Sequence, residues 1–314
     1  MIAGSLVAVF GGTGFIGRHL VRRLAKAGAR VRVVVRDPEA GMFLKPMGEP
    51  GQIILDRGNL LDAGSVAEAV AGADIVVNLV GVLYESGPYT FAAVHVEGAR
   101  SVAEAAKAAG ARRLVQVSAI GASKRSPALY ARTKAAGEAA VGKAFPGATI
   151  VRPSIVFGPE DDFFNRFAAL ARLVPALPLY GGGRTRFQPV YVGDVAEAIV
   201  RILEDAQTAG KTYELGGPHV YTFREVLEIV LRETGRARLL VPLPFWVADL
   251  QARAFELLPK PLLTRDQVKM LARDNVVGRK ALGLADLGIT PTAVEAVVPA
   301  YLVRHRRGGT VPAA

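Results

Sequence analysis

The sequence predicts an α/β protein with a doubly wound parallel sheet and a smaller C-terminal α/β lobe. Three observations support this. In the first half of the 314-residue chain, short apolar runs alternate with amphipathic stretches, as strands joined by crossover helices do. The expected strands are almost continuously apolar, which is typical where helices cover both faces of a sheet. A glycine-rich segment separates the first expected strand from the first expected helix.

Each element follows from its own pattern. β-branched and apolar runs predict six strands, at residues 6–10, 30–35, 53–55, 75–80, 114–117 and 148–151. Apolar residues at helical spacing predict helices between them, at residues 16–27, 63–70, 91–109 and 128–144. Gly28 is expected to end the first helix.

After Arg152 the regular alternation ends, because prolines interrupt the chain at five positions up to Pro189. Helices are still expected at 195–203 and 223–234. We therefore expect a dinucleotide-binding domain over residues 1–152, to which a later strand returns. The smaller substrate or partner lobe and the C-terminal tail would occupy residues 153–314.

One segment of that lobe, residues 239–261, is apolar and rich in proline. Two readings stay open. It either fills the core of the lobe or presents an apolar surface, with Arg253 and Lys260 near anionic headgroups or a partner.

The composition limits the possible partners. Lys and Arg number 39 against 28 Asp and Glu, a formal net charge of +11. This excess favours an anionic partner, such as a phosphorylated cofactor, an acidic protein or an anionic membrane surface, or else serves solubility. The basic residues are not interleaved with aromatic residues, so we expect no nucleic-acid partner.

A metal site is not expected either. The chain has no Cys, and its four His are dispersed without carboxylates at ligand spacing. The acidic run at residues 160–162 is expected to cap a helix that starts near Phe163 rather than to bind a metal ion.

The N-terminal residues 1–17 carry no basic segment, and glycines interrupt their apolar run. We therefore expect a cytoplasmic protein, which could be peripheral on the cytoplasmic face of the inner membrane.

The glycine-rich segment has the spacing of a dinucleotide-binding loop. Gly11 permits a tight turn, Gly14 lets the backbone approach a pyrophosphate, and Gly17 lets the helix pack close to the sheet. The N–H groups at the helix start would bind the phosphates. The residues of the loop expected to contact the cofactor are Gly11, Thr13, Gly14, Phe15, Ile16 and Gly17.

The residue after the second strand indicates the cofactor. Proteins that bind NAD usually place a carboxylate there, which accepts a hydrogen bond from the ribose 2′-hydroxyl. Here Arg36 follows the strand, and a guanidinium can bind a 2′-phosphate. We therefore predict NADP⁺ or NADPH rather than NADH, although Asp37 could also turn inward.

Polar and small residues follow the third and fourth strands, at the sheet edge where such folds bind ligands. Asn59 and Leu60 are candidates to contact the adenine half, whereas Asp62 could contact adenine or cap the next helix. Val80 and Gly81 would let the backbone approach the cofactor.

Tyr130 and Lys134 lie four residues apart and so share one face of the expected helix. A lysine beside a tyrosine favours the phenolate and lowers the phenol pKa, so that the tyrosine can pass a proton to a carbonyl. The same lysine could hold the nicotinamide ribose.

Together these motifs resemble the extended or atypical branch of the short-chain dehydrogenase/reductase superfamily. The match also includes Arg152-Pro153, and the resemblance implies that Pro153 lies near the nicotinamide. Active members place a hydroxyl after the fifth strand to bond the substrate carbonyl. Here the expected position falls near Ile120; Ser118, the candidate catalytic hydroxyl, comes slightly early, and Ser123 comes late.

A narrower resemblance rests on residues 151–167, 263–268 and 274–277. These are similar to the Rossmann-type, NADPH-binding accessory subunit of respiratory complex I and its bacterial relatives. The resemblance implies a protein that binds NADPH with little or no turnover and associates with complex I subunits. The alternatives are an active NADPH-dependent reductase, epimerase or dehydratase that uses Tyr130 and Lys134, and a regulator that senses the nucleotide.

Overall fold

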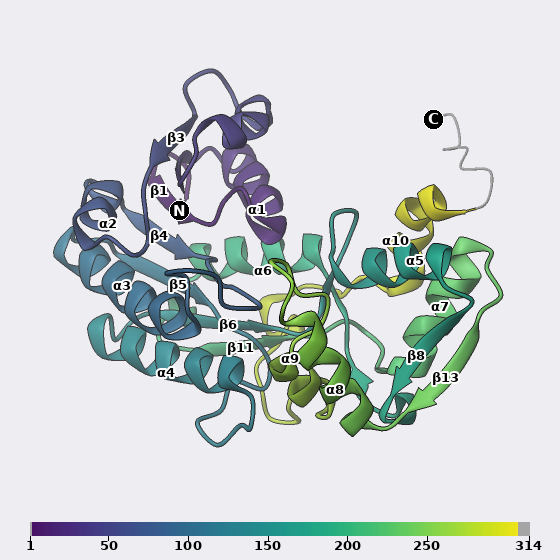
Figure 1. The fold of residues 1–314 in the computed structure, drawn as a ribbon. Helices are drawn as coiled ribbons and strands as arrows, with labels where there is room; N and C mark the ends of the chain where they lie inside the picture. The colour runs from purple at the N-terminus through teal and green to yellow at the C-terminus, as the bar shows by residue number, and fades with distance from the viewer. Residues whose placement is uncertain (1, 307–314) are drawn as a thin grey trace. The chain divides into compact units, whose positions relative to one another are not determined.

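The computed structural model describes residues 2–306, and the C-terminal residues 307–314 lie outside this range. The chain divides into two compact units (Figure 1). The first comprises Met1–Pro153, Gly193–Leu215 and Lys280–Ile289, and the second comprises Ser154–Val192, Gly216–Arg279 and Thr290–Ala314. The first unit thus includes a helix, a strand and a further short segment from the later part of the sequence.

The first unit is built on a sheet of seven parallel strands. They are β1 (Leu6–Phe10), β2 (Arg30–Val35), β3 (Ile53–Arg57), β4 (Ile75–Asn78), β5 (Arg113–Val117), β6 (Thr149–Pro153) and β11 (Thr212–Leu215). Their order in the sheet is β11-β6-β5-β4-β1-β2-β3. The chain winds outward in both directions from β1 and β4, so the predicted doubly wound Rossmann sheet is confirmed. Ligands bind such sheets at the carboxyl ends of these two strands.

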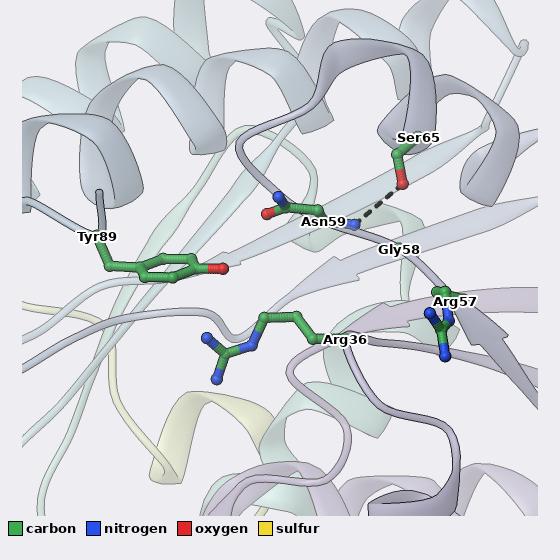
Figure 2. A pocket seen from close by; sticks show the side chains of 6 residues that line it. All are labelled: Arg36, Arg57, Gly58, Asn59, Ser65 and Tyr89. Carbon is green, nitrogen blue, oxygen red and sulfur yellow. Dashed lines mark hydrogen bonds between the residues drawn. The ribbon is translucent and has the colours of Figure 1, made fainter. Parts of the chain in front are cut away.

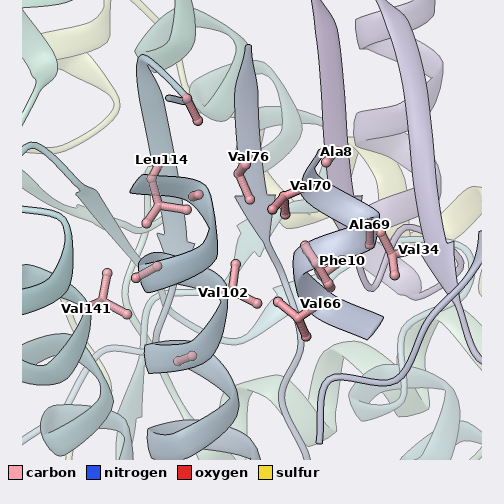
Figure 3. Close-up of a cluster of buried hydrophobic side chains, with 14 of the residues drawn as sticks. Ala8, Phe10, Val34, Val66, Ala69, Val70, Val76, Val102, Leu114 and Val141 are labelled. Atoms are coloured by element: carbon pink, nitrogen blue, oxygen red, sulfur yellow. The ribbon is translucent and has the colours of Figure 1, made fainter. Parts of the chain in front are cut away.

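Alternate residues of the strands face opposite layers of helices. Ala8, Phe10 and Val34 join a buried apolar cluster with three helices (Figure 3). These helices are α2 (Ala63–Val70), α3 (Ala99–Ala108) and α4 (Leu129–Ala144). Val9 and Val33 face the other way, toward α1 (Phe15–Lys26), where both lie close to Gly12. An ion pair of 3.6 Å between Arg23 and Glu197 links α1 to α6 (Val192–Glu204).

The single helix expected over residues 91–109 is divided into two parts. Ala92–Gly98 forms a π-helix, η2, and the α-helix α3 begins only at Ala99. The cause is tertiary packing, because η2 lies against α4 so closely that a Cβ on Gly137 would overlap the carbonyl oxygen of His95. π-helical segments are rare and often occur at functional sites.

The described part of the second unit, which ends at residue 306, contains three two-stranded sheets and five α-helices. The strand pairs are β7 (Val156–Phe157) with β10 (Val190–Tyr191), β9 (Arg186–Phe187) with β12 (Tyr221–Thr222), and β8 (Ala176–Tyr180) with β13 (Leu239–Leu243). The helices are α5 (Phe163–Leu173), α7 (Phe223–Thr234), α8 (Phe245–Phe255), α9 (Arg265–Leu271) and α10 (Val294–Leu302). Aromatic rings from α5, β9 and α7 pack together in its core.

Short 3₁₀ helices connect several of these elements. They are η1 (Glu39–Met47), η3 (Gly181–Gly183), η4 (Ala206–Thr208), η5 (Ala285–Leu287) and η6 (Val303–His305).

The acidic run before α5 is confirmed as the start of a helix. The carboxylate that bonds to the first turn belongs to Asp161, one residue before the N-cap position. Asp162 occupies the N-cap position but makes no side-chain cap. Instead, the Asp161 carboxylate accepts from the Asn165 N–H at 3.2 Å. Asp161 also accepts from the Tyr301 hydroxyl of α10. The run therefore ties helices of the second unit together.

The side chains of the apolar segment 239–261 are divided between the core of the second unit and the solvent-exposed surface. Leu240, Ala248 and Ala252 pack in the core of the second unit. Other side chains of this segment and its neighbourhood face solvent: Leu239 is 72% exposed, Trp246 70% and Leu250 61%, and Leu257 and Leu262 are exposed too. Trp246 and Leu250 lie one helical turn apart on α8, so they share a face.

Candidate functional site

The glycine loop lies at the carboxyl end of β1 and has the geometry of a phosphate-binding turn. Gly11 has a φ of +78°, which favours glycine, and its carbonyl oxygen accepts from the Gly14 N–H at 3.0 Å. A Cβ on Gly17 would overlap that same oxygen. Only glycine at position 17 therefore allows α1 to start so close to the turn.

The first turn of α1 is open to an anion. Its N-cap residue, Gly14, is exposed and supplies no side-chain cap, and the first turn contains no acidic residue. The partly buried Phe15 and Ile16 follow, and the Thr13 carbonyl accepts from Arg18 at 3.3 Å. N–H groups at such a helix start attract phosphate through hydrogen bonds and the helix dipole.

A hollow of about 310 Å³ lies over the ends of β2 and β3 (Figure 2). Its lining residues are Arg36, Arg57, Gly58, Asn59, Ser65 and Tyr89. The Arg36 guanidinium lies 4.9 Å from the centre of the Tyr89 ring, a cation–π distance. The hollow thus combines two guanidinium groups with an aromatic face, a combination that suits a phosphorylated nucleoside.

Two acidic residues near this hollow have structural partners. The Asp37 carboxylate accepts from the Glu39 N–H at 3.0 Å and does not line the hollow. Asp62 is the N-cap of α2 and accepts from the N–H groups of Gly64 and Ser65, which confirms the capping alternative. Neither Asp37 nor Asp62 is among the residues that line the hollow.

Asn59 and Leu60, the two candidates that follow β3, have different environments. Asn59 lines the hollow, where its side-chain oxygen accepts from the Leu61 N–H at 3.1 Å and its own N–H donates to Ser65. The Leu60 side chain is buried in the apolar cluster beneath α2 and α3. At Leu60 only the backbone is therefore available to a ligand.

At the end of β4, a buried pair of amides fixes the backbone. Asn78 donates to the Gln116 side chain at 2.9 Å and accepts from the Val80 N–H at 3.0 Å. Gly81 follows and is exposed. This arrangement holds the chain at Val80 and Gly81 while leaving Gly81 accessible.

α4 places Tyr130 and Lys134 near Gly81. Lys134 is only 6% exposed, and its Nζ donates to the carbonyl oxygen of Val117 at 3.0 Å. A Cβ on Gly81 would lie 3.5 Å from that Nζ. Burial lowers the pKa of Lys134 to about 8, although Glu138 opposes this effect.

The expected effect of the lysine on the tyrosine is not found. Burial raises the pKa of Tyr130 to about 12, whereas the sequence suggested that Lys134 would lower it. Desolvation of the buried phenol disfavours the phenolate and accounts for the shift. Tyr130 is therefore a neutral hydrogen-bond donor at neutral pH.

The hydroxyl that would complete a carbonyl-binding site is displaced. Ile120 occupies the expected position, and its N–H donates to the carbonyl oxygen of Pro153 at 3.1 Å. Ser118 lies at the end of β5 with its hydroxyl buried, and this hydroxyl has no hydrogen-bond partner among the described residues. The bond between Ile120 and Pro153 ties the ends of β5 and β6 together.

Sequence reasoning missed four residues: Arg57, Ser65, Tyr89 and His95. Arg57 and Ser65 lie close to Asn59 in the sequence, so their position beside this predicted site residue could have identified them. Tyr89 reaches Arg36 from a loop 53 positions later, which no local pattern reveals. His95 was grouped with scattered histidines, yet it is buried behind Gly81 and Tyr130.

Residues 2–306 contain no group of three His, Cys, Asp or Glu side chains that could hold a metal ion.

The sheet order, the glycine turn and the open start of α1 define a dinucleotide-binding Rossmann protein. The chain belongs to the NAD dependent epimerase/dehydratase family, whose model matches residues 7–216.

Two curated proteins and one solved structure illustrate what the chain is similar to. The chain is 41% identical to "NADH dehydrogenase [ubiquinone] 1 alpha subcomplex subunit 9, mitochondrial" of Arabidopsis thaliana, over 98% of this chain and 80% of that protein. It is 37% identical to the ceramide reductase of Caulobacter vibrioides, over 63% of this chain and 61% of that protein. The crystal structure of the dTDP-glucose 4,6-dehydratase DesIV from Streptomyces venezuelae matches the fold with a TM-score of 0.73 at 24% identity, over 96% of this chain and 98% of that one.

Proposed function

We propose that this protein is an NADP(H)-binding accessory subunit, or an assembly or stability factor, of NADH:ubiquinone oxidoreductase, with little or no turnover. The observation that carries the proposal is the likeness to the complex I subunit, which extends over 98% of the chain. This similarity therefore includes the second unit as well as the nucleotide-binding sheet. A shared role in assembly requires such similarity outside the nucleotide site.

The site residues fit a nicotinamide dinucleotide. The glycine turn and the uncapped start of α1 form a phosphate cradle. Arg36 and Arg57 line the hollow where the adenosine half would lie, which favours NADP(H) over NAD(H). When bound, NADPH supplies a hydride; the protein's own residues would hold the cofactor and orient its two halves.

The absence of a hydroxyl at Ile120 supports low turnover. Without it, a substrate carbonyl would meet the Tyr130 hydroxyl but not a second, adjacent donor. Loss of one such donor commonly lowers catalytic rates by about 10²–10³-fold. A bound dinucleotide would then stabilise the fold more than it would react.

Peripheral contact with an anionic membrane surface is part of the proposal. Within residues 2–306, no helix is long and apolar enough to cross a membrane. Trp246 and Leu250 instead share an exposed face of α8, and Lys260 lies nearby in sequence. Apolar side chains beside cations bind the interface of anionic bilayers. In a bacterial cell, this would be the cytoplasmic face of the inner membrane.

Co-purification tests the assembly role. Membranes from the native organism, solubilised in mild detergent, should yield complex I subunits with the tagged protein and NADPH in stoichiometric amount. Deletion of the gene should lower the amount of assembled complex I. A protein recovered only in the soluble fraction, without any complex I subunit, would contradict the proposal.

A second candidate function is an NADPH-dependent reductase of a lipid ketone. Two observations favour it: Tyr130 and Lys134 share the inner face of α4 near Gly81, and the chain is similar to a ceramide reductase. The test is turnover of NADPH with 3-ketoceramide in mixed micelles. Turnover that is lost in Tyr130→Phe would establish this activity, and no turnover in the wild type would exclude it for this substrate.

A further inference from the structure

His95 lies in η2 and contacts three parts of the candidate site. Its Nε2 accepts from the N–H of Val82 at 3.1 Å, and its Nδ1 lies 3.1 Å from the hydroxyl oxygen of Thr133. Its ring stacks on Phe91 at 5.4 Å and meets the Tyr130 ring edge-on at 5.2 Å. The side chain is only 3% exposed, so these contacts replace solvent on every polar atom of the ring.

The contacts define the protonation state of the ring. A backbone N–H can only donate, so Nε2 must be unprotonated and Nδ1 must carry the hydrogen. The Nδ1–H then donates to Thr133, whose single hydroxyl hydrogen is shared between the carbonyl oxygens of Leu129 and Tyr130. Burial and the neighbouring Lys134 lower the pKa of His95 to about 3, in agreement with a neutral ring.

The ring therefore connects the segment after β4 to the first turns of α4. Val82 directly follows Gly81, and a Cβ on Gly81 would lie 3.7 Å from the His95 Nε2. On the other side, Tyr130 and Thr133 are fixed through the ring and its Nδ1–H. η2 also packs tightly against Gly137 of α4, and this contact restricts movement of His95 relative to that helix.

We propose that His95 is a positioning residue for the nicotinamide half of the bound dinucleotide. It fixes the backbone at Gly81 and Val82 relative to Tyr130, on the β4–β5 side of the sheet. The hollow at Arg36 and Arg57 lies on the β2–β3 side, where the adenosine half would bind. This inference rests on the proposed dinucleotide binding and extends it to a residue with no expected role.

The experiment compares two ligands that share the adenosine half. Affinities for NADPH and for adenosine 2′,5′-bisphosphate, which lacks the nicotinamide, are measured by calorimetry for the wild type, His95→Phe and His95→Gln. The Phe variant keeps a ring but leaves the Val82 N–H without an acceptor. We expect it to bind NADPH about tenfold more weakly and the bisphosphate within twofold of the wild type.

The Gln variant offers an amide oxygen to Val82 and an N–H to Thr133, so it should restore most of the NADPH affinity. His219→Phe, in the second unit, is the matched control and should bind both ligands as the wild type does. If His95→Phe fails to fold, Thr133→Val takes its place, because it removes the acceptor of the Nδ1–H and should show the same selective loss to a smaller extent.

Four outcomes overturn the inference. A folded His95→Phe variant that binds NADPH as tightly as the wild type, or one that loses affinity for both ligands equally, refutes a role specific to the nicotinamide half. Either result leaves dinucleotide binding in place. ¹⁵N spectra that show a protonated Nε2 would refute the hydrogen-bond assignment. A wild-type protein that binds neither ligand refutes the proposed function, and this inference with it.

Discussion

The guanidinium of Arg36, directly after β2, lies 4.9 Å from the centre of the Tyr89 ring, which belongs to the loop after β4 (Figure 2). This cation–π contact bridges the two strand ends that flank β1 in the sheet. It holds Arg36 at the hollow, where its N–H groups would be the donors to a bound anion. If the protein binds NADP(H) as proposed, its preference for this nucleotide depends on two residues that are 53 positions apart in the sequence.

Arg36→Ala should weaken NADPH binding by about 10- to 100-fold and change NADH binding by less than threefold. The reason is the loss of charge-assisted hydrogen bonds to the 2′-phosphate, which NADH lacks. Fluorescence titration with both nucleotides measures the effect. Arg30→Ala, at the opposite end of β2, is the control and should leave both affinities unchanged. Equal weakening of NADPH and NADH would contradict the assignment.

Gly137→Ala should destabilise the fold by about 2 kcal/mol or more, because the new methyl group would overlap the carbonyl oxygen of His95. Gly142, on the same helix, is the matched control: a Cβ there meets nothing within 4 Å. Gly142→Ala should stabilise the protein by about 0.5–1 kcal/mol through helix propensity. Urea unfolding of both variants measures this contrast, and a Gly137→Ala variant as stable as the wild type would show that η2 does not press on α4.

Lys134 should make the stability of the protein depend on pH. Its pKa is lowered from 10.5 to about 8 in the folded state, so the unfolded chain binds more protons between these two values. The free energy of unfolding must then rise with pH across this window. The full effect of the shift is about 3 kcal/mol.

Urea unfolding at pH 7 and pH 9.5 measures this effect for the wild type and Lys134→Met. The wild type should gain about 1–2 kcal/mol relative to the variant between the two pH values. Lys143→Met, at an exposed position of the same helix, should follow the wild type. If Lys134→Met and the wild type change in parallel, the ammonium is not buried as the structure describes.

The sequence was sufficient wherever a local pattern determined the structure. α2 begins and ends at the expected residues, 63 and 70, because the Asp62 cap and the apolar face of the helix lie within one short segment. The parallel, doubly wound sheet was likewise predicted from apolar runs that alternate with amphipathic stretches, and the structure confirms it.

Features that depend on tertiary packing were not predicted. The π-helix at 92–98 results from close contact with Gly137, 39 positions beyond the end of η2. The pKa of Tyr130 depends on the burial of its side chain. The four-residue spacing between Tyr130 and Lys134 contains no information about burial. Arg57 and Tyr89 line the same hollow because the end of β3 and the loop after β4 lie at the same edge of the sheet.

The exposed apolar face of α8 should determine membrane attachment. Replacing both Trp246 and Leu250 by Ser should reduce co-sedimentation with vesicles that contain anionic phospholipid, since each side chain loses about 1–2 kcal/mol of burial at the interface. The apparent affinity should fall by at least tenfold, and binding of the wild type should weaken with added salt because Lys260 interacts with the headgroups. Ile54→Ser, at an exposed apolar position of β3 in the first unit, is the control and should sediment like the wild type. If the double variant sediments as well as the wild type, this face is not the attachment surface, and Trp246 and Leu250 are instead available to contact a protein subunit.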